Sequence, residues 1–159
     1  MTSLIQIHSR RTVLGLVVGM TVGLVRPIRA EAPATLEVYK DPNCGCCTGW
    51  IAHLKHHGFV TRATDTAEMD AIKKRLSVPD ALASCHTATL GNYIIEGHVP
   101  AHAIKRLLAE KPDALGLAVP GMPIGSPGME GGKPEAYDVI LFSKGAQSSF
   151  GRYLGDRPI

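Results

Sequence analysis

The sequence predicts an α/β domain in which helices pack on a sheet, followed by an extension rich in Gly, Pro and Met. Strand-like and helix-like patterns alternate through the first half of the chain. Three cysteines stand where the first strand passes into the first helix, and a hairpin signal followed by a helix occupies the second half. Alternating strands and helices favour a sheet with helices on its faces. At 159 residues the chain is long enough for one such domain.

The first half predicts a β-α-β-α order. Residues 36–39 alternate between apolar and polar side chains, as a half-buried strand does. A helix should follow the cysteines and end at about His57, because Gly58 suits the residue after a helix C-cap. Residues 59–64 form a second predicted strand. The second helix, capped by Asp65 or Thr66 and ending before Val78-Pro79, places three apolar side chains on one face: Met69, Ile72 and Leu76.

The second half predicts a hairpin and a third helix. Residues 86–90 and 93–96 are short apolar runs separated by Gly91-Asn92, which is typical of a hairpin turn. Pro100 suits the first turn of a helix that buries Ile104, Leu107 and Leu108. This element order is that of a thioredoxin-like domain.

The C-terminal part, residues 116–159, is an extension to that domain. Ten of the nineteen residues from Gly116 to Pro134 are Gly or Pro, so we expect no regular structure there. A late strand is predicted at 137–142, and the polar tail from Ser143 is expected to be loosely held.

Residues 1–30 carry the features of a secretory signal peptide. Arg10-Arg11 precede an uncharged, largely apolar run at 13–25, and small residues suited to cleavage follow. The paired arginines resemble a twin-arginine signal. Thirteen apolar residues fall short of the roughly 20 that a membrane-spanning helix needs, so export is favoured over anchoring. Residues 31–35 are a short linker, and the mature domain is 36–159.

The charge of the mature domain excludes nucleic acid as a partner. The whole chain has 17 basic and 14 acidic residues, but residues 1–30 hold four arginines and no acid. The remainder has 13 basic against 14 acidic residues, so its balance is close to neutral. We therefore expect a periplasmic protein that is monomeric and not inserted in the membrane once the signal is removed.

Three cysteines within four residues carry the chemistry. Cys44 and Cys47 have the C-x-x-C spacing of thiol–disulfide exchange, and Cys46 lies between them. The N-terminus of a helix favours the thiolate form of such cysteines. A third thiol competes with the resolving thiol in exchange, whereas three thiolates can converge on Cu(I). In an oxidising compartment a bridge inside this turn is unstrained only at the Cys44–Cys47 spacing.

Further soft donors lie outside the first turn. Cys85 begins the hairpin, which in a thioredoxin-like chain runs beside the first helix, so it is a candidate fourth sulfur. His98 precedes the third helix and either caps that helix or reaches the metal. Met122 and Met129 stand in the Gly/Pro-rich loop, where a thioether ligand and a packing role are equally open.

Other histidines are weaker candidates. His86 should point to the strand face opposite Cys85. His53 with His56 or His57 has i, i+3 or i, i+4 spacing and is a candidate weak metal pair, but a solvated face is favoured for these three histidines. His102 is also expected at the surface. Zinc fits less well than copper, because structural zinc sites usually use two separated pairs of ligands. No nucleophile–base set or paired carboxylates indicate a hydrolase.

The chain resembles the CopG-type copper-resistance proteins of Gram-negative bacteria. The resemblance covers nearly all of the mature chain and rests on four blocks in order: residues 39–47 (YKDPNCGCC), 84–87 (SCHT), 97–100 (GHVP) and 121–129 (GMPIGSPGM). It implies a thioredoxin-like domain whose extension adds to the metal site. It further implies a polynuclear, cysteine-bridged copper cluster that interconverts Cu(I) and Cu(II) in support of copper efflux.

By this resemblance the metal ligands are Cys44, Cys46, Cys47 and Cys85, with His98, Met122 and Met129 as outer ligands. The sequence does not decide whether the protein is an enzyme; if it is one, a copper oxidoreductase is the activity expected. Two alternatives remain: a thiol–disulfide oxidoreductase that uses Cys44 and Cys47, and a passive copper carrier without a redox cycle.

Overall fold

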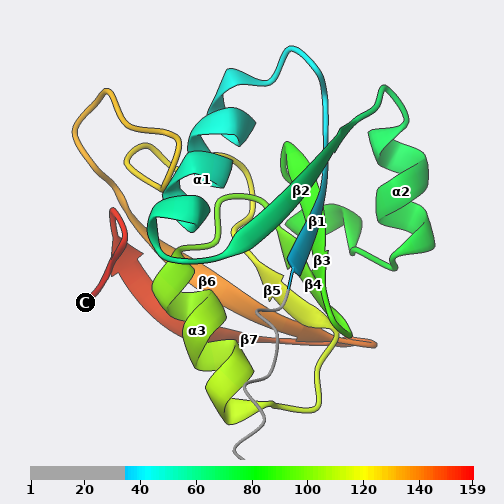
Figure 1. The fold of residues 1–159 in the computed structure, drawn as a ribbon. Coiled ribbons are helices and arrows are strands. Elements are labelled where there is room, and N and C mark those ends of the chain that lie inside the picture. Colours follow the sequence, from blue (N-terminus) through cyan, green and yellow to red (C-terminus); the bar gives the residue numbers. More distant parts are fainter. Residues whose placement is uncertain (1–34) are drawn as a thin grey trace, which may run out of the picture. The chain divides into compact units, whose positions relative to one another are not determined.

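The computed structural model describes residues 35–159, which form three α-helices and one sheet of eight strands (Figure 1). The predicted signal peptide and residues 31–34 of the predicted linker lie outside the described residues. The helices are α1 (Gly45–His56), α2 (Met69–Arg75) and α3 (Ala101–Glu110), with a short 3₁₀ helix at Asp80–Leu82. The strands are β1 (Thr35–Lys40), β2 (Val60–Asp65), β3 (His86–Leu90), β4 (Tyr93–Glu96), β5 (Gly116–Ala118), β6 (Ala136–Ser143), β7 (Ala146–Leu154) and β8 (Arg157–Pro158).

The elements from β1 to α3 form the predicted thioredoxin-like unit. β1 lies in the middle of its part of the sheet, parallel to β2 and antiparallel to β3, and β4 pairs antiparallel with β3. The predicted hairpin is confirmed, with its turn at Gly91-Asn92. α1 ends at His56, and Gly58 follows with a φ of +87°, the left-handed conformation that ends many helices.

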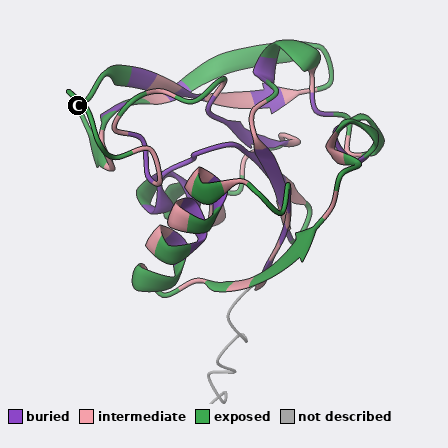
Figure 2. Ribbon diagram, turned by 90° about the horizontal axis from the view of Figure 1, so that it is seen from above, coloured by how far each residue is buried: buried purple, intermediate pink, exposed green. Residues whose placement is uncertain are grey.

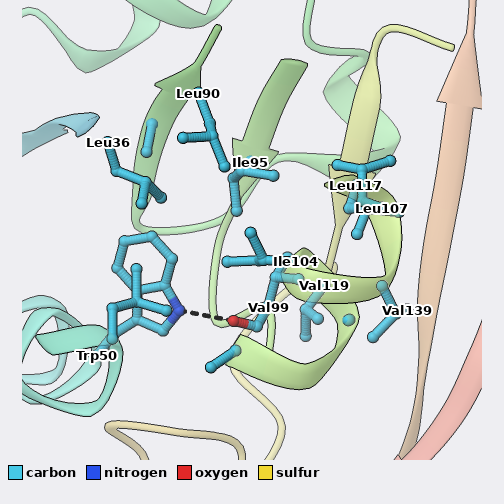
Figure 3. Close-up of a cluster of buried hydrophobic side chains, with 14 of the residues drawn as sticks. Leu36, Trp50, Leu90, Ile95, Val99, Ile104, Leu107, Leu117, Val119 and Val139 are labelled. Atoms are coloured by element: carbon cyan, nitrogen blue, oxygen red, sulfur yellow. Dashed lines mark hydrogen bonds between the residues drawn. The ribbon is translucent and has the colours of Figure 1, made fainter. Parts of the chain in front are cut away.

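Two apolar layers lie on opposite faces of the sheet. Trp50, Leu54 and the buried face of α3 pack on Leu36, Leu90 and Ile95 (Figure 3). The Trp50 indole N–H donates a hydrogen bond of 2.9 Å to the Val99 carbonyl oxygen, which ties α1 to the segment entering α3. A smaller cluster on the other face is made of Val78, Leu82, Ile94, Ala118 and Phe142. Neighbouring residues such as Ile94 and Ile95 thus belong to different layers, as the alternation of a strand requires. Buried positions accordingly follow the strands through the centre of the domain, while exposed positions dominate the outer helix faces (Figure 2).

The C-terminal extension is more regular than expected. β5 lies within the Gly/Pro-rich stretch and pairs parallel with β4 and antiparallel with β6. The tail from Ser143, expected to be loose, is mostly β7 and β8, so both of these predictions were wrong. The physical reason is tertiary: β5 is three buried residues held between two strands, and β7 is a largely exposed strand whose register comes from β6.

The remaining Gly/Pro-rich segment, residues 119–135, contains no helix or strand and is called here the covering loop. It leaves β5 and returns into β6, which are adjacent in the sheet, and in Figure 1 it runs beside α1. Within residues 35–159, no helix has the length and apolar character needed to cross a membrane.

Candidate metal centre

The first turn of α1 positions three of the four cysteines. Cys44 is the N-cap residue, and its backbone N–H bonds to the Asp41 carbonyl oxygen at 3.1 Å. The Asp41 carboxylate accepts a 2.7 Å hydrogen bond from the Asn43 N–H, so the turn holds itself in place before the helix begins. Cys46 and Cys47 follow within the first turn, where unpaired backbone N–H groups favour negative charge.

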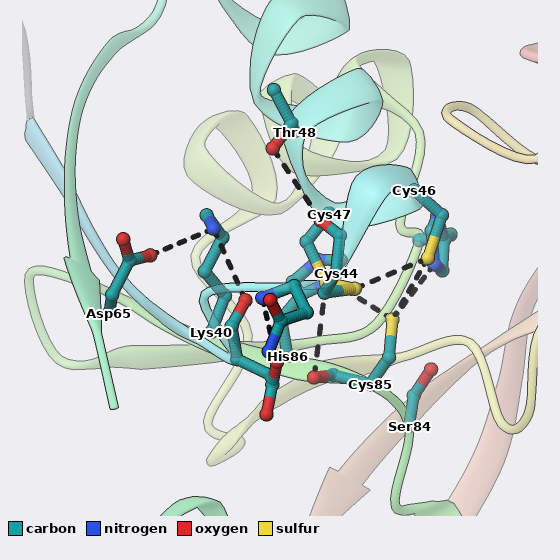
Figure 4. Close-up of a disulfide and its surroundings, with 12 residues drawn as sticks. Lys40, Cys44, Cys46, Cys47, Thr48, Asp65, Ser84, Cys85 and His86 are labelled. Atoms are coloured by element: carbon teal, nitrogen blue, oxygen red, sulfur yellow. Dashed lines mark hydrogen bonds and ion pairs between the residues drawn. A yellow bond between two sulfur atoms is a disulfide. The ribbon is translucent and has the colours of Figure 1, made fainter. Parts of the chain in front are cut away.

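Cys85 meets these cysteines from the start of β3. Its Sγ lies 3.8 Å from Cys46 Sγ, which in turn lies 3.3 Å from Cys44 Sγ (Figure 4). The sulfur atoms of all four cysteines lie within 4.8 Å of one another. Cys47 is fully buried, while the other three cysteines are partly exposed. The structure therefore brings together the four sulfurs that sequence spacing selected.

A buried ion pair holds the segment that carries Cys85. The Glu96 carboxylate, at 0% exposure, pairs with Lys73 from α2. It also accepts hydrogen bonds of 2.6 Å from the Ser84 backbone N–H and from the Thr87 hydroxyl. Burial raises the pKa of Glu96, and the ammonium of Lys73 opposes that shift. These contacts hold Ser84 and Thr87, which lie on either side of Cys85 in the sequence. The position of the Cys85 segment therefore depends on Glu96 in β4 and on Lys73 in α2.

Cys44 and Cys47 are joined by a disulfide in this structure, whereas Cys46 and Cys85 are free. The sequence spacing predicted that, within this turn, only a bridge between Cys44 and Cys47 would be free of strain. Two of the four sulfurs therefore carry no thiolate charge in this state. Adding two electrons to the Cys44–Cys47 bond breaks it into two thiolates, so that all four sulfurs are then available to a metal ion.

His98 points at the sulfur cluster. Its Nε2 lies 3.0 Å from Cys85 Sγ, and its Nδ1 lies 2.7 Å from the Pro127 carbonyl oxygen. A carbonyl only accepts, so Nδ1 carries the proton and Nε2 offers a lone pair to Cys85. Burial, followed by the neighbouring Cys46, raises the pKa of Cys85 to about 12. Burial lowers the pKa of His98. The Cys85 thiol consequently donates to a neutral His98, and a soft cation would replace that proton.

His86 lies closer to the cluster than sequence alternation predicted. Its fully buried ring packs on Trp50 at 4.3 Å between ring centres, and its Nδ1 lies 3.3 Å from Cys85 Sγ. Its Nε2 has no hydrogen-bond partner among residues 35–159. The expectation that His86 points away from Cys85 was wrong, because Cys85 precedes the strand and is not bound by its alternation. Adjacency to Cys85 was the available signal.

The covering loop lies against the first turn of α1. A Cβ on Gly128 would lie 2.6 Å from the backbone nitrogen of Trp50 and closer still to the backbone carbonyl oxygen of Cys46. Met129 is the next residue, and it is partly exposed. Met122 is 52% exposed, and its neighbour Gly121 accepts a hydrogen bond from Ser84 beside Cys85. Both methionines thus follow backbone that touches the cysteine segments, and both remain predicted outer ligands.

The histidines of α1 do not form a plain solvated face. His53 is half-buried, and its Nε2 accepts a 3.1 Å hydrogen bond from the Ala101 N–H at the start of α3. His53 therefore performs the capping that sequence reasoning assigned to His98 as one option. Burial, with His57 as the next cause, lowers the pKa of His53 to about 4. His56 and His102 are exposed, as expected.

The donor set around the cysteines suits a soft metal ion. Thiolate and thioether sulfur favour Cu(I), and imidazole nitrogen also accepts Cu(II) or Zn(II). Cys85, His86 and His98 form a second overlapping group whose ligand atoms lie within 4.8 Å of one another. Sulfur and nitrogen donors therefore meet at one point, between the first turn of α1 and the segments around β3 and β4.

Comparisons with known proteins place the chain in a family. A family model described as a protein of unknown function, DUF411, matches residues 82–129, which include Cys85, His98 and both methionines. No curated protein sequence matches the chain. Two solved structures do: copper resistance protein CopG form 1, at 44% identity and a TM-score of 0.72, and form 2, at 44% identity and a TM-score of 0.73. The matches cover 77% of this chain and 98% and 99% of those chains, respectively. The chain therefore belongs to the CopG family.

Proposed function

We propose that the protein binds copper through its clustered cysteines and acts in copper resistance in the periplasm. The observation that carries the proposal is the convergence of four sulfurs, with His98 3.0 Å from one of them. The similarity to copper resistance protein CopG supports copper as the cargo. The proposed ligands are Cys44, Cys46, Cys47 and Cys85, with His98, Met122 and Met129 as outer ligands.

The proposed site is polynuclear because its sulfurs are close enough to be shared. Cys46 Sγ lies within 3.8 Å of both Cys44 Sγ and Cys85 Sγ, so one thiolate can bridge between two ions held by its neighbours. Full occupancy requires the dithiol form of Cys44 and Cys47. A site that combines thiolates with imidazole supports copper in both oxidation states, so we include interconversion of Cu(I) and Cu(II) in the proposal.

The remaining parts of the proposal concern the cellular setting. An export signal at 1–30 would deliver the domain to the periplasm, where it would work as a monomer and pass copper to efflux components. Replacing Arg10-Arg11 with Lys-Lys and following the protein in periplasmic fractions tests the twin-arginine route. Unchanged export would exclude that route.

Copper titration of the reduced chain tests the central claim. Under anaerobic conditions with reductant we expect several Cu(I) ions per chain and thiolate-to-copper charge-transfer absorption. Cys46→Ser should lose more than one ion, since it removes a bridging sulfur. Met122→Leu should weaken binding while Met69→Leu, a matched change on α2, should not. Unchanged stoichiometry in Cys46→Ser would refute the cluster.

The disulfide favours one alternative function, thiol–disulfide exchange. Cys44 and Cys47 are bonded at the N-terminus of a helix, the arrangement used by disulfide oxidoreductases. Insulin reduction by metal-free protein separates the two functions: activity that persists in Cys46→Ser supports exchange. A passive carrier, in turn, would hold copper whose oxidation state does not change reversibly in electrochemical titration.

A further inference from the structure

A second group of metal-ligating side chains lies at the other end of α1. His53, His57 and Asp156 have ligand atoms within 4.8 Å of one another, and none of them belongs to the sulfur cluster. His53 is seven residues beyond Cys46, which places it about 10 Å further along the helix axis. The group therefore needs an explanation of its own.

Three elements contribute to this group, which we call the histidine cluster: His53, His57, His102 and Asp156. His57 directly follows α1, His102 is the second residue of α3, and Asp156 lies in the turn between β7 and β8. The rings of His53 and His57 have centres 4.5 Å apart, and those of His57 and His102 are 5.3 Å apart. Residues distant in sequence thus bring the ligand atoms of His53, His57 and Asp156 together, and His102 lies beside them.

His57 and Asp156 face each other without a hydrogen bond between their side chains. His57 Nε2 lies 4.0 Å from Asp156 Oδ2, which is too long for a hydrogen bond. Two donors bound to one ion at about 2.0–2.1 Å in a tetrahedral site are about 3.3 Å apart. A contraction of about 1 Å, within the reach of side-chain rotation, would therefore bring these atoms to coordination distance.

Hydrogen bonding already orients one of the imidazoles. His102 Nδ1 lies 3.1 Å from the Asp156 carbonyl oxygen and must donate to it, which leaves its Nε2 with a free lone pair. Ligating histidines commonly donate their other ring N–H to a backbone carbonyl in this way. Burial lowers the pKa of His53 and His57, so both rings are neutral at neutral pH and available as ligands.

Two features limit the affinity of the cluster. His53 Nε2 accepts from the Ala101 N–H, so ligation through that atom would require giving up this bond, and His53 is the weakest of the four donors. The ammonium of Lys105 acts electrostatically on His57 and opposes a cation, whereas Glu130 and Asp156 act on His53 with the opposite sign. His57 and Asp156 are therefore the stronger donors of the group, His53 completes it, and His102 adjoins it.

We propose that the histidine cluster is a second metal site, which binds a divalent cation of borderline softness through imidazole nitrogen and carboxylate oxygen. The order of affinities for such donors predicts Cu(II) as the tightest ligand, with Zn(II) and Ni(II) weaker. The cluster contains no thiolate, so it does not favour Cu(I). This inference is independent of copper binding at the cysteines.

The test uses Cu(II) alone as the probe, in the full-length Cys46→Ser, Cys85→Ser chain with the Cys44–Cys47 disulfide intact. This background has no free thiol to reduce the ion. We expect one Cu(II) per chain with nitrogen coupling in its electron paramagnetic resonance spectrum. His57→Gln and Asp156→Asn should each weaken binding by about tenfold or more. His56→Gln is the matched control, since His56 is exposed on the same turn, and should change affinity less than twofold.

Two results would overturn the inference: an unchanged affinity in His57→Gln, or an equal loss in His56→Gln, which would indicate adventitious surface binding only. Far-UV circular dichroism checks that each variant is folded. If the serine background does not fold, Ni(II) is added to the unmodified chain, and paramagnetic broadening of the His57 and His102 imidazole signals replaces the copper readout. Broadening spread evenly over all exposed histidines would refute the site. Thiolate-to-copper absorption in His57→Gln, measured separately, reports on the cysteine site alone.

Discussion

Gly128 offers the sharpest test of how the covering loop is held over the cysteines. Its φ is +89°, and a Cβ at this position would lie 2.6 Å from the backbone nitrogen of Trp50. This backbone belongs to α1 and cannot move away without shifting the helix. Gly58 has nearly the same φ, +87°, but a Cβ at that position meets nothing within 4 Å. Alanine therefore pays the same cost for the left-handed conformation at both positions, but it clashes with neighbouring atoms only at position 128.

The magnitude follows from these contacts. The left-handed conformation costs alanine about 1–2 kcal/mol at either position. At Gly128 the loop must also withdraw from α1, which breaks the 2.7 Å bond from His98 to the Pro127 carbonyl oxygen. That bond contributes about 1 kcal/mol, and lost packing against Gly49 adds to it. We expect Gly128→Ala to lower the free energy of unfolding by about 2–4 kcal/mol and Gly58→Ala by about 1–2 kcal/mol.

Urea unfolding followed by Trp50 fluorescence measures both variants, because Trp50 is buried under the loop contact. Copper titration adds a second readout. His98 should lose its fixed tautomer in Gly128→Ala, so that variant should bind copper more weakly, whereas Gly58→Ala should bind as the parent does. Equal destabilisation of the two variants would show that the loop does not rest on α1 as described, and the reasoning would fail.

Three other predictions concern stability and access to the cysteines. Glu96→Gln keeps an oxygen for the Ser84 N–H but leaves Lys73 without its counter-charge, so we expect the free energy of unfolding in urea to fall by about 3 kcal/mol. The double variant Lys73→Met, Glu96→Gln should recover part of this loss, and a double variant no more stable than Glu96→Gln would contradict the reasoning. Burial raises the pKa of Tyr137 above its ordinary 10.0, so the unfolded state loses a proton first and the free energy of unfolding should fall as pH rises above 10. Tyr137→Phe should reduce that alkaline slope in thermal melts, and an equal slope in parent and Tyr137→Phe would refute the assignment. Finally, protein with an intact Cys44–Cys47 disulfide should bind fewer Cu(I) ions than reduced protein, as counted by metal analysis, and equal counts would show that these two sulfurs are not ligands.

The fold was predictable where local pattern and tertiary structure agree. The alternation in β1, the turn at Gly91-Asn92 and the amphipathic face of α3 all read the same way in sequence and in structure. β5 and β7 were missed because their signals are not local. Three residues at Gly116–Ala118 cannot show a period, and most side chains of β7 are exposed, so its strand character comes from pairing with β6.

Part of the candidate site could likewise be predicted from local sequence, and part depends on tertiary contacts. The spacing of Cys44, Cys46 and Cys47 and the thioredoxin-like order sufficed to place four sulfurs together. The orientation of His98 could not be read from the sequence, because it depends on a carbonyl oxygen 29 residues away. For the histidine cluster, sequence spacing offered only His53 with His57 as a weak pair and favoured a solvated face, because His102 and Asp156 reach the end of α1 only through the packing of α3 and the final strands.

The way the covering loop is anchored has a consequence for how ions reach the sulfurs. Its two ends continue into β5 and β6, which are hydrogen-bonded neighbours, so lifting the loop beyond Val119 breaks no hydrogen bond between strands of the sheet. The energy needed to lift the loop from the cysteines is then that of its own contacts, which are the hydrogen bonds of Gly121 with Ser84 and of Pro127 with His98 and the packing of Gly128 on α1, below the cost of unfolding the domain. Access of ions to the sulfurs is thereby separated from the stability of the scaffold, and amide exchange in 120–135 should proceed while the flanking strands stay protected.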